Sequence, residues 1–409
     1  MVPVSLKFKE DMPEQMKPYR PRVPMDLRHA YELEFSRMTK YFYEPSTSPV
    51  ASPIVVAKKA TKPFIRICGD YRKVNKFLLV PKFPIPEVIQ ELHKIINYCI
   101  YIDLDVTNAF HQIPIDLSTS EKLSVQSLFG QFRPKFMPEG VSPASLILMK
   151  VMREIFNDFL EWTIVIHDNI LLLAKDYDDA FEKLVKVIER CHQRNLILKL
   201  SKSRFGVREV EFFGYVCKGG SYKLSDERVQ RVVSIPFPDS VKSMQRFLGA
   251  SMYFKPFIYD YSRKTALLSD MIHKSFNWNP NSWTEDYRAC FSSFLQDILN
   301  AFTLYHPDQS LDWYLFVDAS DVAVGGVLVQ LTRDDQQQVI SFVSKKFSAQ
   351  AKAWSTIEKE AFAMFYSVSQ LRHYLTGKPF ILLTDHRNLM WIETSEVPVA
   401  YRYFSGKTN

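Results

Sequence analysis

Short runs of apolar and polar residues alternate along the chain from about residue 45 onward. Alternation with a period of two predicts strands over residues 52–59, 64–72 and 98–106. Apolar residues at three- and four-residue steps predict helices over residues 86–97 and 143–160. Strands and helices that follow one another in this way are typical of an α+β or α/β layout.

Further along the chain, the patterns extend this layout. Two apolar runs in residues 162–174 flank a short polar tip and predict a β-hairpin with a two-residue Asp-Asn turn. Residues 225–301 are mostly helical in pattern. The last part of the chain predicts a strand over residues 313–320, a helix over 355–375 and a strand over 380–386.

These patterns predict four parts of the chain. Residues 1–44 are rich in Pro and charge and lead into the segment EPSTSPVASP, which predicts an extended N-terminal arm. A mixed part with strands and helices is expected over residues 45–222. A mostly helical part follows over residues 223–305, and a second mixed part over residues 306–409.

The composition narrows the class of protein. The 409 residues are 46% hydrophobic and 24% charged, which is typical of a folded chain and excludes disordered, collagen-like and coiled-coil classes. Only 12 residues are Gly, and neither G-x-x-x-x-G-K nor G-x-G-x-x-G occurs. A P-loop or a dinucleotide-binding fold is therefore not expected.

Charge and cysteine content give weaker indications. Lys and Arg outnumber Asp and Glu by 52 to 45, and the net charge of +7 permits a polyanionic partner without proving one. The five Cys residues are scattered without a C-x-x-C pair, which favours reduced intracellular thiols over zinc ligands or disulfides. No signal peptide and no run of 18 apolar residues occur, so a membrane span is not expected.

Acidic residues lie at two unusual positions. The strand over residues 98–106 places Asp103 and Asp105 on one face, about 7 Å apart, and Asp168 lies at the tip of the predicted hairpin. Each acid alone has a structural explanation, as a solvated strand end or as a turn residue. Together they match the layout of two-metal phosphoryl transfer, in which oxygen ligands from converging strands hold two Mg²⁺ ions about 4 Å apart.

Seven segments follow one another in the order and spacing of the polymerase motifs of one family. They begin with SPVASPIVVAKK, continue through FIRICGDYRKVNK, LDVTNAFHQIPI, MPEGVSPAS, HDNILLLA and KSRFGVREVEFFGYV, and end with IPFPDSVKSMQRFLGASMYFKPFI. In these segments the chain resembles the reverse transcriptase of Gypsy-type LTR retrotransposons. The resemblance implies an α+β right-hand polymerase, with fingers and palm in residues 45–222 and thumb and connection in 223–305.

The same resemblance implies the metal ligands of the polymerase. Asp105 matches the first of them, and Asp103 is the second choice for that role because it shares the face. The Y-x-D-D hairpin of the family falls on residues 166–169, where Asp168 keeps the first acid and Asn169 replaces the second. An amide oxygen coordinates Mg²⁺ without bringing charge, so Asn169 is expected to impair catalysis, with Asp105 and Asp168 as the minimal pair.

Contacts to the incoming nucleotide are also implied by the resemblance. Lys58, Lys59 and Arg66 lie on the hairpin that covers the triphosphate in the family, where cationic side chains suit phosphate oxygens. Exposed basic residues on a solvated hairpin are the structural alternative. Phe110 matches the aromatic gate that selects deoxynucleotides, and Gly140 a position where the backbone approaches nucleotide or template closely.

Phe212, Phe213 and Gly214 resemble the hairpin that grips the primer end in the family. The segment that contains Gly140 departs from the family pattern at Pro143 and Met149, where Asn and Gln are usual. These departures weaken the prediction of template contacts in that segment.

The C-terminal part resembles the ribonuclease H domain that follows the polymerase in this family, which implies Asp318, Glu360 and Asp385 as metal ligands. Glu360 also falls inside an apolar helical stripe, where an acid seldom lies without a partner. Only Glu393 and Glu396 follow Asp385, so the helix with the family's fourth acid is expected to be missing and the α/β domain incomplete. Three carboxylates hold one Mg²⁺ well and a second poorly, so weak or absent RNA cleavage is expected.

Our leading hypothesis is an RNA-directed DNA polymerase of a retroelement, present as a fragment of a longer polyprotein or as a decayed copy. Its expected cofactor is Mg²⁺ or Mn²⁺, and its expected partners are an RNA template, a DNA primer, an RNA–DNA hybrid and dNTP, with no membrane. An intracellular location is expected, in the cytoplasm or a retroelement particle, with access to the nucleus left open. The alternatives are a decayed or repurposed copy that binds nucleic acid without catalysis and, less favoured, a chain with ribonuclease H activity alone.

Overall fold

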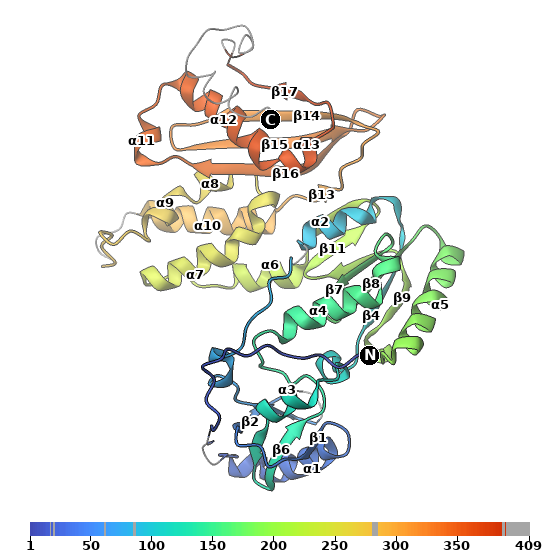
Figure 1. Cartoon of the computed structure of the whole chain (residues 1–409). Helices are drawn as coiled ribbons and strands as arrows, with labels where there is room; N and C mark the ends of the chain where they lie inside the picture. Colours follow the sequence, from blue (N-terminus) through green and yellow to red (C-terminus); the bar gives the residue numbers. More distant parts are fainter. Residues whose placement is uncertain are drawn as a thin grey trace. The chain divides into compact units, whose positions relative to one another are not determined.

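The structure is a computed structural model that describes residues 1–16, 18, 21–60, 63–84, 87–279, 285–386 and 389. The chain forms two compact units, whose elements are labelled in Figure 1. The first unit comprises Met1–Lys94 and Ile100–Val207, and the second comprises Ile95–Cys99 and Arg208–Asn409.

A five-stranded sheet lies in the first unit. Its neighbouring strands are antiparallel except for one parallel pair, β2 with β5. The strand order is β1 (Tyr43–Pro45), β6 (Gly130–Pro134), β5 (Val125–Ser127), β2 (Ser52–Lys58) and β3 (Ile65–Gly69). Strands β2 and β3 are the pair predicted over residues 52–59 and 64–72, and the short helices α2 (Val88–Leu92) and α3 (Leu117–Lys122) belong to the same unit.

Helix α1 (Arg28–Thr39) differs from the extended arm expected over residues 1–44. The described residues before Met25 form no helix, so only the first part of the arm is extended. The ring of Tyr31 on α1 is fully buried and stacks on Phe129 at a centroid distance of 5.9 Å. Burial of aromatic rings against the sheet stabilises this helix, which is a tertiary effect that the Pro-rich pattern does not reveal.

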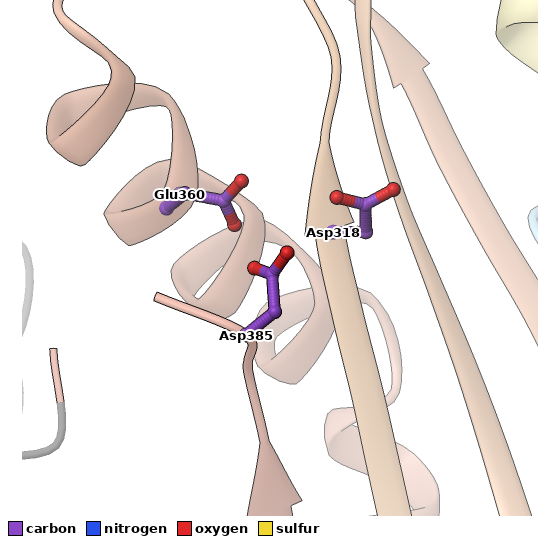
Figure 2. A group of neighbouring side chains, drawn as sticks. All are labelled: Asp318, Glu360 and Asp385. Atoms are coloured by element: carbon purple, nitrogen blue, oxygen red, sulfur yellow. The ribbon is translucent and has the colours of Figure 1, made fainter. Parts of the chain in front are cut away.

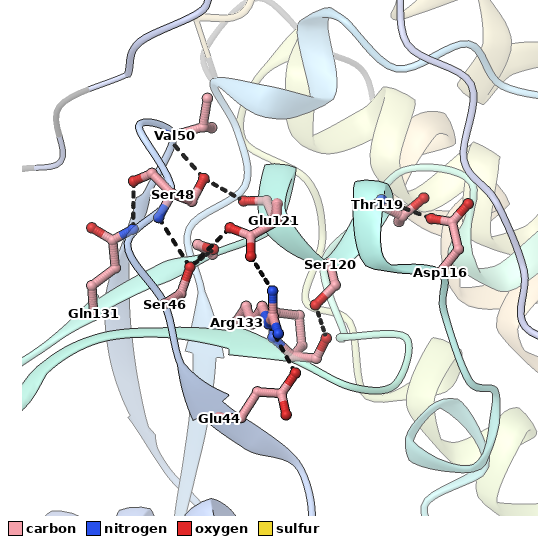
Figure 3. A network of polar contacts seen from close by, with 12 residues as sticks. Glu44, Ser46, Ser48, Val50, Asp116, Thr119, Ser120, Glu121, Gln131 and Arg133 are labelled. Carbon is pink, nitrogen blue, oxygen red and sulfur yellow. Dashed lines mark hydrogen bonds and ion pairs between the residues drawn. The ribbon is translucent and has the colours of Figure 1, made fainter.

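Arg133 on β6 joins three elements of the five-stranded sheet and its surroundings (Figure 3). Its Nε donates to Glu44 Oε1 on β1 at 2.8 Å, and its Nη1 donates to Glu121 on α3. Beside it, Gln131 Nε2 donates to the backbone oxygen of Ser48 at 2.6 Å. Charge-assisted hydrogen bonds in a half-buried setting fix the position of α3 against the sheet.

An antiparallel sheet of four strands carries the predicted hairpin. The strand order is β7 (Thr163–Ile166), β8 (Asn169–Ala174), β4 (Ile100–Asp105) and β9 (Arg204–Val207). Helices α4 (Ala144–Ile155) and α5 (Tyr177–Arg194) pack against these strands.

The hairpin over residues 162–174 is confirmed, but the expected Asp-Asn turn is wrong. Ile166 pairs with Asn169, so the two turn residues are His167 and Asp168, and Asn169 is already the first residue of β8. The φ of His167 is 54°, in the left-handed region that tight hairpin turns use. The pairing register of β7 with β8 therefore determines which residues form the turn, although the dipeptide Asp168-Asn169 itself favours a turn.

The second unit begins with a small antiparallel sheet, followed by the helices expected over residues 225–301. The strand order is β10 (Val210–Phe212), β11 (Tyr215–Lys218), β12 (Ser221–Leu224) and β13 (Leu304–Tyr305). The helices are α6 (Asp226–Val233), α7 (Val241–Ser251), α8 (Tyr261–Lys264), α9 (Ala266–Asp270) and α10 (Glu285–Leu299).

A second sheet of the same unit has the order β16 (Gln337–Lys346), β15 (Ala323–Leu331), β14 (Asp312–Ala319) and β17 (Ile381–Leu383). β17 runs parallel to β14, and the other neighbours are antiparallel. Helix α12 (Thr356–Gln370) begins with a capping box between Ser355 and Glu358 and packs on β14 and β15. Two short helices flank it, α11 (Ala349–Lys352) and α13 (Arg372–Leu375).

Alternate residues of β14 build the core beneath α12. Trp313, Leu315 and Val317 are buried in one hydrophobic cluster with residues of α12, whereas Asp318 is exposed. The α/β character predicted for this part is thereby confirmed. Among the described residues, no helix combines the length and apolar composition that crossing a membrane requires.

We expect Arg133→Met to lower the free energy of unfolding of the first unit by about 1–2 kcal/mol, because it leaves two half-buried carboxylates without their shared cation. The matched control is Arg28→Met, which removes an exposed pair with Glu32 and is expected to cost under about 0.5 kcal/mol. Urea unfolding followed by circular dichroism measures both. Equal losses for the two variants would contradict a special role of Arg133.

Candidate functional site

Asp105 and Asp168, the first pair of acids predicted as metal ligands, lie at the same end of neighbouring strands. Asp105 is the last residue of β4 and pairs with Asn169, the first residue of β8. The backbone N–H of Val106 donates to the backbone oxygen of Asp168 at 3.1 Å. The structure therefore brings together two acids that are remote in sequence, while their role as metal ligands stays a prediction.

The ends of β4 and β8 provide mostly oxygen ligands. Asp105 and Asp168 offer carboxylates, and Asn169 offers an amide whose Nδ2 donates to Asp168 Oδ1 at 3.4 Å. Such hard oxygen donors fit Mg²⁺ or Mn²⁺. Because Asn169 is a neutral amide, this donor set carries less negative charge than three carboxylates would.

Lys202 lies beside this donor set, which the sequence did not predict. Its Nζ lies 3.6 Å from Asp105 Oδ2, and the backbone N–H of Asp105 donates to Ser203 Oγ at 3.4 Å. The side chain of Asp105 is 24% exposed and that of Lys202 is 59% exposed. An exposed ammonium beside a mostly buried carboxylate balances its charge and can be displaced by a divalent cation.

Asp103, the second choice for the first ligand, lies inside the sheet. It pairs with Leu171 on β8 and with Arg204 on β9, and its Oδ1 is buried without a hydrogen bond among the described residues. Burial raises the pKa of Asp103, the charge of Arg204 lowers it, and the charge of Asp105 raises it. Asp105 is better placed to meet solvent and substrate because it ends the strand.

Gln112 ties the segment that contains Phe110 to the strand ends. Phe110 lies on a 3₁₀ helix, Ala109–Gln112. The side chain of Gln112 accepts from the N–H of Ile197 at 2.7 Å, donates back to the oxygen of Ile197 at 3.0 Å, and also donates to the oxygen of Thr107. This two-way bond fixes the partly buried ring of Phe110 relative to β4.

His111, between these two residues, stacks on Phe42 at a centroid distance of 4.1 Å. Burial lowers the pKa of His111 to about 4. The positive charges of Arg37 and Arg66 also lower this pKa, whereas the negative charge of Glu34 raises it. The imidazole is therefore neutral near pH 7 and acts as a packing residue.

The predicted nucleotide contacts fall into two groups. Arg66 Nε lies 3.5 Å from Glu139 Oε2, which precedes Gly140, so that the structure brings Arg66 and Gly140 together. Lys58 instead pairs with Asp26 at 2.8 Å, and Lys59 is exposed.

Gly140 adopts a backbone conformation that favours glycine, while its predicted close approach to nucleotide or template stays a prediction. Its φ is +88°, a conformation that side chains disfavour. Asn75, which the sequence analysis missed, donates from Nδ2 to the oxygen of Gly140 at 2.9 Å and accepts from the N–H of Ser142 at 3.0 Å. The amide of Asn75 therefore holds this turn in place.

The residues predicted to grip the primer lie in the second unit. Phe212 ends β10 and is buried, and Phe213 and Gly214 form the turn to β11 with φ values of 50° and 75°. The positive φ of Gly214 disfavours any side chain, and a Cβ there would lie 2.7 Å from Nε of Arg228, whose flexible side chain would have to shift. The guanidinium of Arg228 stacks over the ring of Tyr215 at 5.0 Å.

The structure brings together Asp318, Glu360 and Asp385 (Figure 2), whose predicted role as metal ligands stays a prediction. One ligand atom from each residue lies within 4.8 Å of the others, and the three side chains come from the end of β14, from α12 and from the segment after β17. The segment after Asp385 with Glu393 and Glu396, where the helix with the fourth acid is expected to be missing, lies outside the described residues except for residues 386 and 389.

The bonding of Glu360 fits a divalent cation in this cluster. Glu360 is only 4% exposed; its Oε1 accepts from the N–H of Ala319 at 3.2 Å, and its Oε2 is buried with no hydrogen bond among the described residues. Burial raises the pKa of Glu360 to about 7, and the negative charges of Asp318 and Asp385 contribute to this rise. The hydrogen bond from the N–H of Ala319 lowers the pKa and partly offsets them. A buried carboxylate oxygen without a partner is costly unless a cation or a proton neutralises it.

Comparisons with known proteins agree with this arrangement. Residues 56–217 match the family "Reverse transcriptase (RNA-dependent DNA polymerase)", and residues 308–403 match "RNase H-like domain found in reverse transcriptase". The retrovirus-related Pol polyprotein from transposon opus of Drosophila melanogaster is 29% identical over 90% of this chain. The transposon Tf2-7 polyprotein of Schizosaccharomyces pombe is 31% identical over 81% of it. The matched regions span 38% and 25% of the lengths of these two relatives.

Solved structures show the same fold. A foamy viral protease-reverse transcriptase dRH in complex with double-stranded DNA aligns with a TM-score of 0.85 at 17% identity, covering 97% of this chain and 69% of that one. A foamy viral protease-reverse transcriptase in complex with an RNA/DNA hybrid aligns with a TM-score of 0.76 at 17% identity, covering 99% and 55%. The predicted fold class is confirmed by these likenesses.

We expect the affinity of the Asp318 cluster for Mn²⁺ to rise with pH up to about 7 and then to level off. Below that pH the cation has to displace a proton from Glu360, so the apparent affinity falls by up to about tenfold per pH unit. Calorimetric titration in buffers of different ionisation enthalpy measures the released proton, in a chain with Asp105→Asn and Asp168→Asn to silence the other site. Glu360→Gln is expected to remove the proton release, and a pH-independent affinity of the unsubstituted cluster would contradict the account.

Proposed function

Because the chain belongs to the reverse transcriptase family of retrotransposon polyproteins, with a ribonuclease H-like domain after the polymerase domain, we propose that it is an RNA-directed DNA polymerase of an LTR retrotransposon. Asp105 and Asp168 would hold the catalytic cations, and their adjacency across β4 and β8 is the observation that supports the proposal. The whole polyproteins are longer than this chain, so the proposal concerns the polymerase step alone.

Bound Mg²⁺ or Mn²⁺ would favour the alkoxide of the primer 3′-hydroxyl and neutralise charge on the triphosphate. Asp105 and Asp168 would orient these cations, and Gln112, bonded to Ile197, would hold Phe110 so that its ring collides with a ribose 2′-hydroxyl. Arg66, once released from Glu139, would pair with phosphate oxygens. The chain thus supplies positioning and charge stabilisation, the two requirements of phosphoryl transfer.

Asn169 lowers the expected activity of this site. It keeps an oxygen donor but removes one negative charge beside Asp168. The cations would therefore bind more weakly than at a site with three carboxylates. We propose that the polymerase is impaired but active, and that it needs a higher cation concentration.

The proposed partners are an RNA template, a DNA primer, an RNA–DNA hybrid and dNTP. The solved relatives were captured with double-stranded DNA and with an RNA/DNA hybrid, which supports nucleic-acid partners here. Contacts to phosphates would make binding weaken steeply with salt. At the ribonuclease H-like domain we propose at most weak cleavage of the RNA strand.

Primer extension on an RNA template with Mg²⁺ or Mn²⁺ tests the proposal. We expect extension by the unsubstituted chain and a loss of at least about a hundredfold in Asp105→Ala and in Asp168→Ala, because either change removes a cation ligand. Asp178→Ala, an exposed acid on α5, is the matched control and should change nothing. If the unsubstituted chain extends no better than the double variant while still binding hybrid, the alternative of a non-catalytic nucleic-acid-binding copy holds.

Asn169→Asp is expected to lower the Mg²⁺ concentration for half-maximal extension by about tenfold, or ~1.4 kcal/mol, because it restores a charged ligand. Asn169→Ala, which removes the oxygen donor, is the control and should raise that concentration. Mg²⁺ titrations of the extension rate measure both changes. No difference among the three chains would show that position 169 does not contact the cations.

A further inference from the structure

A strained turn of residues 213–214 joins β10 to β11. Phe213 and Gly214 have φ values of 50° and 75°. A positive φ is unfavourable for a bulky residue such as Phe213, so surrounding contacts have to hold the turn in this conformation. The backbone oxygen of Gly214 accepts from the N–H of Ser225 at 2.9 Å. Ser225 is the N-cap of α6, and its Oγ accepts from the N–H of Arg228 at 3.4 Å, so the turn is joined to the start of that helix.

The guanidinium of Arg228 lies against Gly214. A Cβ at position 214 would meet Nε, Cζ and Nη2 of Arg228 at 2.7, 2.8 and 2.9 Å. These three distances are nearly equal, which places position 214 over the flat face of the guanidinium and not at its edge. The 213–214 turn therefore rests on a planar group that comes from α6.

Two tyrosine rings hold this guanidinium in place. Its Cζ lies 5.0 Å from the ring centroid of Tyr215 on β11, and 4.9 Å from that of Tyr253 in the 3₁₀ helix Met252–Phe257. Aromatic rings attract a planar cation at such distances. Nη1 of Arg228 is buried and has no hydrogen bond among the described residues. Packing on the two rings, and not hydrogen bonding of Nη1, therefore fixes the group.

We propose that Arg228 is a positioning residue for the primer strand, because its guanidinium, held by Tyr215 and Tyr253, keeps the 213–214 turn in the conformation that contacts the primer. The inference rests on the proposed polymerase function and on the predicted primer contact of this turn. Arg228 acts through the turn and does not touch the primer itself.

The consequence concerns the rate of extension more than binding. Without the guanidinium, the turn would relax toward a less strained backbone conformation and shift the primer end that it contacts. Most contacts to the nucleic-acid backbone would remain, so affinity would change little. Phosphoryl transfer would slow, because it depends on the alignment of the primer 3′-hydroxyl with the reacting phosphate.

Single-turnover primer extension by the full chain on an RNA template with Mg²⁺ tests the proposal. We expect Arg228→Met and Arg228→Lys each to lower the maximal rate by about tenfold, with the Kd of the primer–template changed by less than about twofold. Lys keeps the charge but lacks the planar group, so it should not replace Arg228. Arg231→Met, which removes an exposed pair with Glu227 on the same helix, is the matched control and should keep the parent rate.

Tyr253 provides a second test of the same support. Tyr253→Leu should reproduce the loss of rate, whereas Tyr253→Phe keeps the ring and should retain the parent rate. Arg228→Met and Tyr253→Leu in one chain should together lose no more than about tenfold, because both changes remove the same contact. Titration of active enzyme with primer–template corrects each rate, so that poor folding lowers the active fraction and not the rate.

Four outcomes would reject the inference in distinguishable ways. An unchanged rate in Arg228→Met would show that the turn keeps its conformation without Arg228. A loss confined to the active fraction would make Arg228 a purely structural residue. Weaker primer–template binding in Arg228→Met that Arg228→Lys restores, with a smaller salt dependence, would show a direct contact to phosphate. Absence of extension by the unsubstituted chain would reject the proposed function, and this inference with it.

Discussion

The antiparallel pairing of β4 with β8 is the contact on which the proposed polymerase site depends. It sets Asp105 opposite Asn169 and lets Val106 bond the backbone of Asp168, so that side chains from remote segments share one edge of a sheet. A slip of one residue would turn these side chains to the other face. The buried strand β8 and the core around it fix that register.

The two candidate sites differ in how the repulsion among their clustered carboxylates is reduced. At the strand ends Asp105 has Lys202 as a nearby cation and Asn169 in place of a third acid, which reduces repulsion but also weakens the attraction for Mg²⁺. At the second site Glu360 is buried with one oxygen that has no hydrogen bond among the described residues, and its pKa is raised by burial first and then by the charges of Asp318 and Asp385. The second site therefore retains the stronger demand for a cation.

The sequence predicted what depends on local pattern. Period-two alternation located β4, an apolar run after a polar tip located β8, and the position of Glu360 inside an apolar stripe marked it as an unusual acid. The turn at His167 and Asp168 was wrong by one residue, because the ladder outweighs the preference of Asp-Asn for turns. Helix α1 was missed because its stability comes from distant aromatic partners.

Contacts between distant segments account for what the sequence could not predict. Lys202 beside Asp105 and Gln112 on Ile197 join residues whose proximity no local pattern reveals. Lys58 pairs with Asp26, so one of the expected phosphate contacts has another partner in this structure.

The most direct test of the central claim is the anomalous diffraction of a crystal of this chain grown with Mn²⁺, primer and template. The account predicts an anomalous peak within about 2.5 Å of a carboxylate oxygen of Asp105 and of one of Asp168. Well-ordered side chains at both residues with no peak between them would contradict it.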